Sequence, residues 1–129
     1  MRRDRLHWTL VFTPASLEHL AERGVDANDV AAVVFGHYGP AWLRRGGRGR
    51  GERWFAMGPL GGGELLTCIL RRAEPRDLES EGAFVTPPTG LPEDPGTFAD
   101  WMRLCVSARM SHDDEARAYR LWRRSKRGR

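Results

Sequence analysis

The chain of 129 residues carries a formal net charge of +4 at pH 7, and 40% of its residues are hydrophobic. This length fits a single domain over residues 1–129, and the longest apolar run, residues 30–35, is too short to cross a bilayer. The basic N-terminus has no long apolar segment and no small-residue cleavage site. We therefore expect no signal peptide, no membrane partner and a cytoplasmic location.

Two cysteines, Cys68 and Cys105, are present, and both lie in predicted strands. We expect buried reduced thiols, although a disulfide stays open if these strands are adjacent. No CxxC pair and no cysteine–histidine cluster has the spacing of metal ligands. The sequence therefore predicts no metal and no other cofactor.

Positive charge is concentrated in two blocks, almost all of it arginine. The first block is Arg44, Arg45, Arg48, Arg50 and Arg53, and the second is Arg117, Arg120, Arg123, Arg124, Lys126, Arg127 and Arg129. Such blocks attract polyanions or acidic proteins, and arginine suits phosphate contacts and stacking on bases. A general arginine bias can equally reflect genome composition, so the argument for RNA rests on the clustering.

The N-terminal part of the chain predicts one strand and two helices. Residues 6–12 alternate weakly and predict a short strand. A helix is expected over 14–23 with Thr13 as its N-cap, and a second over 27–35 with Asp26 as its N-cap. Apolar residues recur on one side of each helix, which predicts that both cover a sheet.

The central part predicts a β-hairpin. Its strands are expected at 52–57 and 64–70, joined by a turn over 58–63 that is rich in glycine. Residues 41–45 predict a strand beside the first of these, and 44–51 predict a glycine-rich loop or hairpin tip.

The C-terminal part predicts an insertion, a strand and a helix. Residues 72–100 are acidic and rich in proline, which argues against regular structure. A strand is expected over 101–109, then a helix that Ser111 caps with Asp114 three residues on, and a frayed basic tail over 125–129. The whole order predicts an α+β domain, in which helices from both ends pack on a small twisted sheet of three or four antiparallel strands.

Four segments, taken in order, resemble BrnT-type toxins of the RelE/ParE-like superfamily. They are HLAERGVDANDVAAVVF at 19–35, GERWFAM at 51–57, the strand at 65–71 and VSARMSHDDEARAY at 106–119. The resemblance implies a RelE-like fold and a bacterial type II toxin, an endoribonuclease that cleaves RNA and inhibits translation. It also implies a complex with an acidic cognate antitoxin, in a homo- or hetero-oligomer. The 72–100 insertion departs from the family, whose last two strands join through a short turn.

Candidate catalytic residues come from the resemblance and from the chemistry of RNA cleavage. The resemblance maps the Ser-Ala-Arg motif of the family onto residues 107–109, which makes Arg109 the first candidate and Glu115 a further one. Attack by a 2′-OH also needs a base, an acid and a cation on the phosphorane. Glu52, Arg53 and His112 are the other candidates, and we expect the strand residues to converge on one sheet edge.

Candidate RNA-binding residues are mostly arginines of the basic blocks. They are Arg44, Arg45, Arg48, Arg50, Arg71, Arg117, Tyr119 and Arg120. Trp42 and Tyr38, which flank the glycine-rich loop, are further candidates for stacking on bases.

Each catalytic candidate also has a structural interpretation. Arg109 can pair with Asp113 or Glu115, Glu52 can pair with an arginine across strands, and His112 can be an exposed residue of a helical turn. The alternative function is accordingly a non-catalytic module that binds nucleic acid or protein on the same fold, and a small scaffold protein also stays open.

Overall fold

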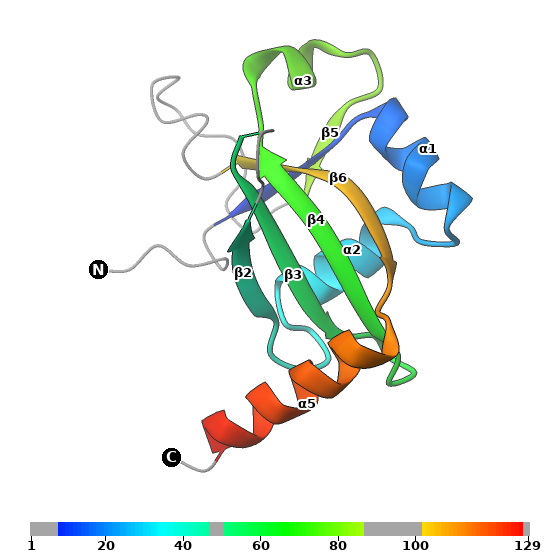
Figure 1. The fold of residues 1–129 in the computed structure, drawn as a ribbon. Coiled ribbons are helices and arrows are strands. Elements are labelled where there is room, and N and C mark those ends of the chain that lie inside the picture. Colours follow the sequence, from blue (N-terminus) through cyan, green and yellow to red (C-terminus); the bar gives the residue numbers. More distant parts are fainter. Residues whose placement is uncertain (1–7, 47–50, 87–101, 128–129) are drawn as a thin grey trace.

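The computed structural model describes residues 8–46, 51–86 and 102–127. Figure 1 shows one sheet with helices on both of its faces. In chain order the elements are β1 (Thr9–Phe12), α1 (Pro14–Glu22), α2 (Ala27–Val34), β2 (Trp42–Gly46), β3 (Arg53–Pro59), β4 (Leu65–Arg72), α3 (Pro75–Glu79), β5 (Phe84–Thr86), β6 (Met102–Met110) and α5 (Asp113–Arg127).

The sheet has six strands in the order β2-β3-β4-β6-β1-β5. Neighbouring strands are antiparallel except for β1 and β6, which pair in parallel. The α+β class is confirmed, but the expectation of three or four antiparallel strands is wrong. A parallel pair joins segments far apart in the chain, so local sequence patterns do not reveal it.

Both N-terminal helices begin at the predicted caps. The side chain of Thr13 accepts a hydrogen bond from the N–H of Ser16, and that of Asp26 accepts one from the N–H of Asp29. Gly24 follows α1 with a φ of 71°, a left-handed conformation that favours glycine. The local signals for helix ends were therefore sufficient here.

The central hairpin is longer than predicted. β3 continues through Gly58 and Pro59, which had been assigned to the turn. The reversal is confined to residues 60–64, where the N–H of Leu60 donates to the carbonyl of Glu64 at 2.8 Å. Pro59 is tolerated because β2 pairs with β3 only as far as Met57, so that side of Pro59 has no strand to which an N–H would donate.

The insertion has regular structure in its first part, contrary to the prediction. Glu74 and Asp77 form a capping box at the start of α3, and Pro75 occupies the first turn of that helix. β5 then pairs with the edge of β1. Residues 87–101 lie outside the described residues, so the prediction for the rest of the insertion is untested.

The two faces of the sheet are covered differently. α1 and α2 lie behind the sheet in Figure 1, over a core to which Val30, Val33 and Val34 contribute fully buried side chains. α3 and α5 lie at opposite ends of the other face. A smaller core beneath α3 includes Met102 and Leu104. On this side, none of the described helices lies over the strands between α3 and α5.

α5 begins differently from the prediction. Ser111 does not cap it; its Oγ instead lies 2.8 Å from the Oγ1 of Thr67 on β4. The side chain of Glu115 accepts a hydrogen bond from the N–H of His112, just before the first helical residue. The helix continues to Arg127, so the predicted frayed tail is largely helical.

Aromatic contacts hold α5 against the sheet. Tyr119 is 3% exposed, and its hydroxyl donates a hydrogen bond to the carbonyl of Pro40 at 2.6 Å. Trp122 stacks on Trp42 of β2, with ring centroids 5.6 Å apart and planes at 14°. These contacts fix the position of α5 at the end of the sheet.

Cys68 and Cys105 are free and buried, which confirms the prediction of reduced thiols. Burial raises the pKa of Cys68 well above its usual value and that of Cys105 to about 12. Both groups therefore stay neutral thiols. Separately, none of the helices described is long and apolar enough to span a membrane.

The Tyr119 hydroxyl should stabilise the fold measurably. Tyr119→Phe removes its hydrogen bond to Pro40 and should lower the free energy of unfolding by about 1 kcal/mol. Urea denaturation followed by circular dichroism measures this difference. Tyr38→Phe, at a side chain that is 55% exposed, is the control and should leave stability unchanged. Equal losses in the two variants would contradict an anchoring role for Tyr119.

Candidate nucleic-acid interface

Side-chain alternation divides the arginines of β2, β3 and β4 between the two faces of the sheet. Successive residues of a strand point to opposite faces. Arg44, Arg53 and Arg71 therefore share the face away from α1 and α2. We call the part of this face between α3 and α5 the open face.

Cross-strand pairing arranges the open face in three rows. The α5 row consists of Trp42, Met57, Thr67 and Arg109. The middle row consists of Arg44, Phe55, Ile69 and Ser107. The α3 row consists of Gly46, Arg53 and, by continuation of the same register, Arg71.

Arg109, in the α5 row, forms a bidentate ion pair with Glu115 of α5. Its Nη1 and Nη2 donate to Oε1 and Oε2 at 2.5 and 2.9 Å. The hydrogen bonds from Arg109 lower the pKa of Glu115 to about 2, and Glu115 in turn raises the pKa of Arg109. Two of the five guanidinium donors are used in this pair, so the others can reach a phosphate.

His112 lies beside this pair. Its Nδ1 is 3.9 Å from Oε1 of Glu115, and its side chain is 68% exposed. Histidine is the residue type most often used for proton transfer near neutral pH. The structure thus brings together three predicted catalytic residues: Arg109, His112 and Glu115.

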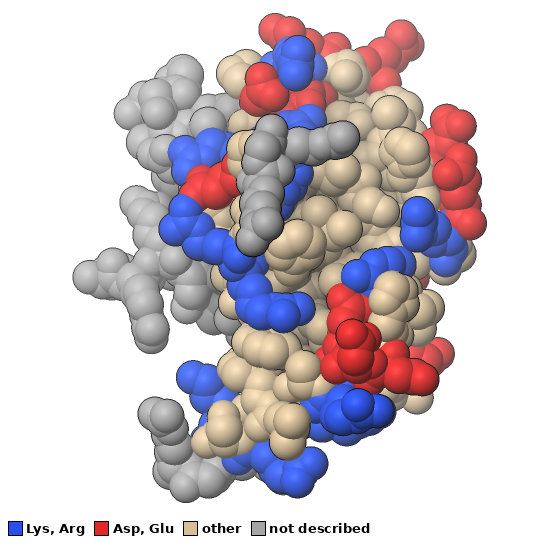
Figure 2. Space-filling view, in the orientation of Figure 1, with Lys and Arg blue, Asp and Glu red and all other residues tan. Residues whose placement is uncertain are grey.

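The middle row combines positive charge with apolar surface. Phe55 and Ile69 are only partly buried, whereas Ala56 and Cys68 on the opposite face are fully buried. The guanidinium of Arg44 lies 4.4 Å from the centroid of the Trp42 ring. Figure 2 shows this side of the molecule, with tan surface in the middle and blue Lys and Arg side chains along the β2 side and around α5.

Arg44 and Arg53 differ from the other arginines near the open face. Arg71 pairs with Asp77, and Arg109 pairs with Glu115. Across the described ranges, neither Arg44 nor Arg53 forms an ion pair with a carboxylate. These two positive charges are therefore available to an anionic ligand.

Glu52 and Arg45 lie away from the open face. Glu52 forms ion pairs with Arg45 and Arg72. The structural interpretation of Glu52, a pair with an arginine across strands, is therefore the one that the structure shows. Of the four residues predicted to converge on one sheet edge, Glu52, Arg53 and Arg71 line one pocket. Arg109 does not join them, because it lies opposite Thr67 in the α5 row. Glu52 and Arg53 are adjacent in sequence, so alternation sends them to opposite faces.

The other predicted RNA-binding residues are scattered. Arg117 and Arg120 are exposed on α5. Tyr119 is buried against Pro40, which corrects its prediction as an RNA contact. Arg48 and Arg50 lie outside the described residues. Tyr38 is exposed, but it lies in a depression beside α2, on the helix-covered side of the sheet.

Sequence reasoning missed three residues that shape this region. Phe55 could have been found from alternation along β3, and Asp77 from the capping pattern that begins at Glu74. Arg103 is 5% exposed on β6, and its guanidinium lies 4.6 Å from the Trp8 ring and 4.2 Å from the Trp54 ring. No local signal marks such a buried arginine, because both tryptophans are distant in sequence.

Comparison with known protein families, curated proteins and solved structures finds no match to this chain. In the part of the chain that the structure describes, no group of three or more His, Cys, Asp and Glu residues is placed to hold a metal ion.

The Arg109–Glu115 pair should make stability depend on pH. The pKa of Glu115 is lowered from 4.5 to about 2 in the folded protein. Its stabilising effect is therefore complete above about pH 4.5 and disappears as the pH falls towards 2. Glu115→Gln should cost about 1 kcal/mol at neutral pH, and this difference from wild type should narrow over that window.

Urea denaturation at a series of pH values measures this effect. Asp113→Asn, which changes an exposed acid in the same helical turn, is the matched control. A difference between wild type and Glu115→Gln that does not change between pH 4.5 and 2 would show that the ion pair does not stabilise the fold.

Proposed function

We propose that the open face binds single-stranded RNA and that Arg109, at one end of it, promotes cleavage of the bound strand. The observation that carries this proposal is the middle row, where Arg44 has no carboxylate partner among the described residues and adjoins partly exposed Phe55. A polyanion with planar bases matches both features.

The shape of the open face favours a single strand over a duplex. A sheet surface offers a flat platform on which unpaired bases stack on aromatic rings while arginines contact the backbone. The Phe55 ring lies over Gly46, where an added Cβ would come within 2.7 Å of it. The choice of RNA over DNA follows the resemblance to BrnT-type toxins.

Arg109 is suited to stabilise charge on a phosphate undergoing attack. Glu115 fixes the guanidinium in one orientation, and the donors that remain can contact the equatorial oxygens of a phosphorane. The low pKa of Glu115 makes it a weak base, so we assign it the positioning of Arg109.

His112 is the candidate for proton transfer. It is exposed and lies next to Glu115, so a 2′-OH bound near Arg109 would be within its reach. Removal of that proton lets the 2′ oxygen attack the adjacent phosphorus, which forms a 2′,3′-cyclic phosphate and breaks the bond from phosphorus to the 5′ oxygen. The 5′ oxygen takes a proton from water as it leaves.

In a cell this activity would make the protein the toxin of a type II toxin–antitoxin pair, as the resemblance implies. An acidic antitoxin would then neutralise it, since the same basic face attracts an acidic protein.

A second candidate is a module that binds RNA without cleaving it. The low pKa of Glu115, about 2, favours this alternative, because such a carboxylate is a poor general base. Among the described residues beside Arg109, only the exposed His112 is then left to accept a proton. Binding without any cleavage would identify this alternative.

Removal of Arg109 tests the proposed function. Arg109→Ala should lower the rate of RNA cleavage by about 10²-fold or more and relieve growth inhibition on induced expression. Denaturing gels of a labelled RNA measure cleavage, and growth curves measure inhibition. Arg23→Ala, an exposed arginine at the end of α1, is the control and should behave as wild type. Equal cleavage by all three proteins would remove Arg109 from the site.

Removal of the Phe55 ring tests the binding surface. Phe55→Ala should weaken binding of a single-stranded RNA by about tenfold, since stacking on an aromatic ring contributes about 1–3 kcal/mol per base. Fluorescence anisotropy measures the affinity. Tyr38→Ala removes an exposed ring beside α2 and should have no effect. An effect of Tyr38→Ala alone would place the RNA on the other side of the sheet.

A further inference from the structure

We propose that Arg53, in the pocket between the α3 row and α3, binds a second backbone phosphate of the RNA strand, remote from Arg109. This inference rests on the proposed function and adds a separate anchoring site to it. The pocket has a volume of about 550 Å³ and is lined by Glu52, Arg53, Arg71, Arg72, Ala73, Glu74, Pro75 and Arg76. It contains four arginines and two glutamates, so its charge favours an anion.

Arg53 is the arginine of this pocket for which the described residues supply no carboxylate partner, whereas Arg71, Arg72 and Arg76 each pair with one. Its Nη1 donates to the backbone carbonyl of Glu52 at 3.1 Å, which orients the side chain without neutralising it. Among the residues described it has no carboxylate partner, and four of its five donors remain for a ligand. A phosphate would complete this arrangement with charge-assisted hydrogen bonds.

The Arg71 side chain lines the pocket beside Arg53 and is held in place by an ion pair. Its Nη1 and Nη2 each donate to an oxygen of Asp77 at 3.0 Å, and its side chain is 23% exposed. Asp77 also accepts a hydrogen bond from the N–H of Glu74 at 2.7 Å, so the start of α3 holds the pair in place. Burial alone would raise the pKa of Asp77, but these hydrogen bonds and the nearby arginine charges lower it, so Asp77 stays ionised.

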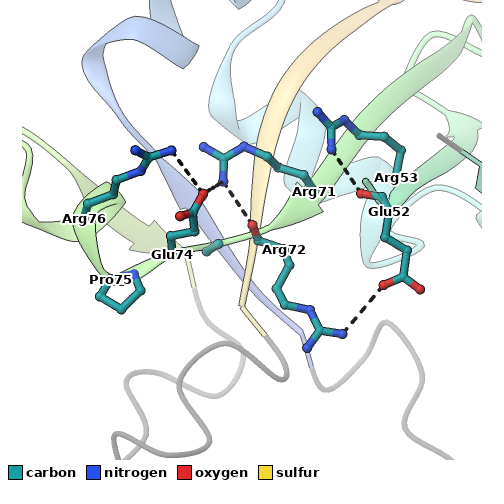
Figure 3. Close-up of a pocket in the computed structure, with 8 residues that line it drawn as sticks. Glu52, Arg53, Arg71, Arg72, Glu74, Pro75 and Arg76 are labelled. Carbon is teal, nitrogen blue, oxygen red and sulfur yellow. Dashed lines mark hydrogen bonds and ion pairs between the residues drawn. The ribbon is translucent and has the colours of Figure 1, made fainter. Parts of the chain in front are cut away.

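The acid adjacent to Arg53 does not block the pocket. Figure 3 shows the guanidinium groups of Arg53, Arg71 and Arg76 projecting to one side, whereas the side chains of Glu52 and Arg72 project to the other. Glu52 and Arg72 pair with each other there at 3.7 Å. Glu74 pairs with Arg71 and Arg76, at 3.8 and 3.3 Å. Among the described residues, Arg53 therefore supplies the unpaired positive charge on the side of the pocket next to the open face.

The position of the pocket fits a strand that runs along the open face. Arg109 pairs across from Thr67 of β4, and Arg71 lies four residues further along the same strand. At about 3.3 Å per residue the two rows are roughly 13 Å apart, with the stacking surface of Phe55 and Ile69 between them. One RNA strand can therefore contact both ends through different phosphates.

The experiment combines protein and RNA substitutions. A labelled single-stranded RNA of about ten nucleotides is bound to wild type, Arg53→Gln and Arg23→Gln, and each linkage in turn is made neutral as a methylphosphonate. Arg23→Gln removes the same charge from an exposed position at the end of α1 and is the matched control. Affinity is measured at several salt concentrations, and cleavage of a dinucleotide is measured in parallel.

If Arg53 binds one particular phosphate, the protein substitution and the neutral linkage at that phosphate should remove the same contact. Arg53→Gln should weaken binding of the full RNA by about tenfold and lower the salt slope by about one, with dinucleotide cleavage unchanged. One neutral linkage, several nucleotides from the cleaved one, should weaken wild type by the same factor and have no further effect on Arg53→Gln.

Other outcomes overturn the proposal. If wild type binds and cleaves RNA but Arg53→Gln behaves like Arg23→Gln, the pocket is not a phosphate site and the proposed function survives. If Arg53→Gln weakens binding of an acidic peptide but leaves RNA binding intact, the pocket serves a protein partner. If wild type neither binds nor cleaves RNA, the proposed function and this inference both fail.

Discussion

Alternation of side chains along β2, β3 and β4 is the constraint on which the rest of the site depends. Register across these strands places Arg44, Phe55 and Ile69 in one row and moves Glu52 to the opposite face. A slip of one residue would exchange the two sets, burying arginine under α1 and α2 and exposing the core. The buried side chains on the helix side therefore fix the register, and the register in turn places the charges of the open face.

Local signals predicted the parts of the fold that depend on neighbours in sequence. Thr13 and Asp26 cap their helices because a cap needs one side chain and the next three residues. The parallel pairing of β1 with β6 depends on residues about ninety positions apart, and no periodicity encodes it. Within the proline-rich segment, proline content alone predicted irregular structure. Pro75 instead occupies the first turn of α3, where proline is tolerated, and so α3 was missed.

The candidate site likewise contains residues that the sequence could identify and residues whose role depends on tertiary packing. Arg109 and Glu115 were found because a resemblance maps both onto one motif, and they form an ion pair in the structure. Glu52 and Arg53 were grouped because one strand was predicted to carry both, yet their side chains project to different sides of the pocket that they line. Phe55 is a candidate for stacking because, within the described parts of the chain, α3 and α5 do not cover its row. That is a property of tertiary packing, which the sequence of β3 does not contain.

The arginines of the open face fall into two kinds that would contribute differently to binding. Arg71 and Arg109 are each held by a carboxylate, so they lose little conformational freedom when a ligand arrives and can define geometry. Arg44 and Arg53 keep their charge unpaired among the described residues, so they would supply attraction and the release of counterions from a polyanion. The two fixed arginines lie at opposite ends of the open face, Arg109 in the α5 row and Arg71 in the α3 row. The two arginines without a described carboxylate partner lie on β2 and β3. A ligand that uses both kinds must be negatively charged along its length, as a single nucleic-acid strand is.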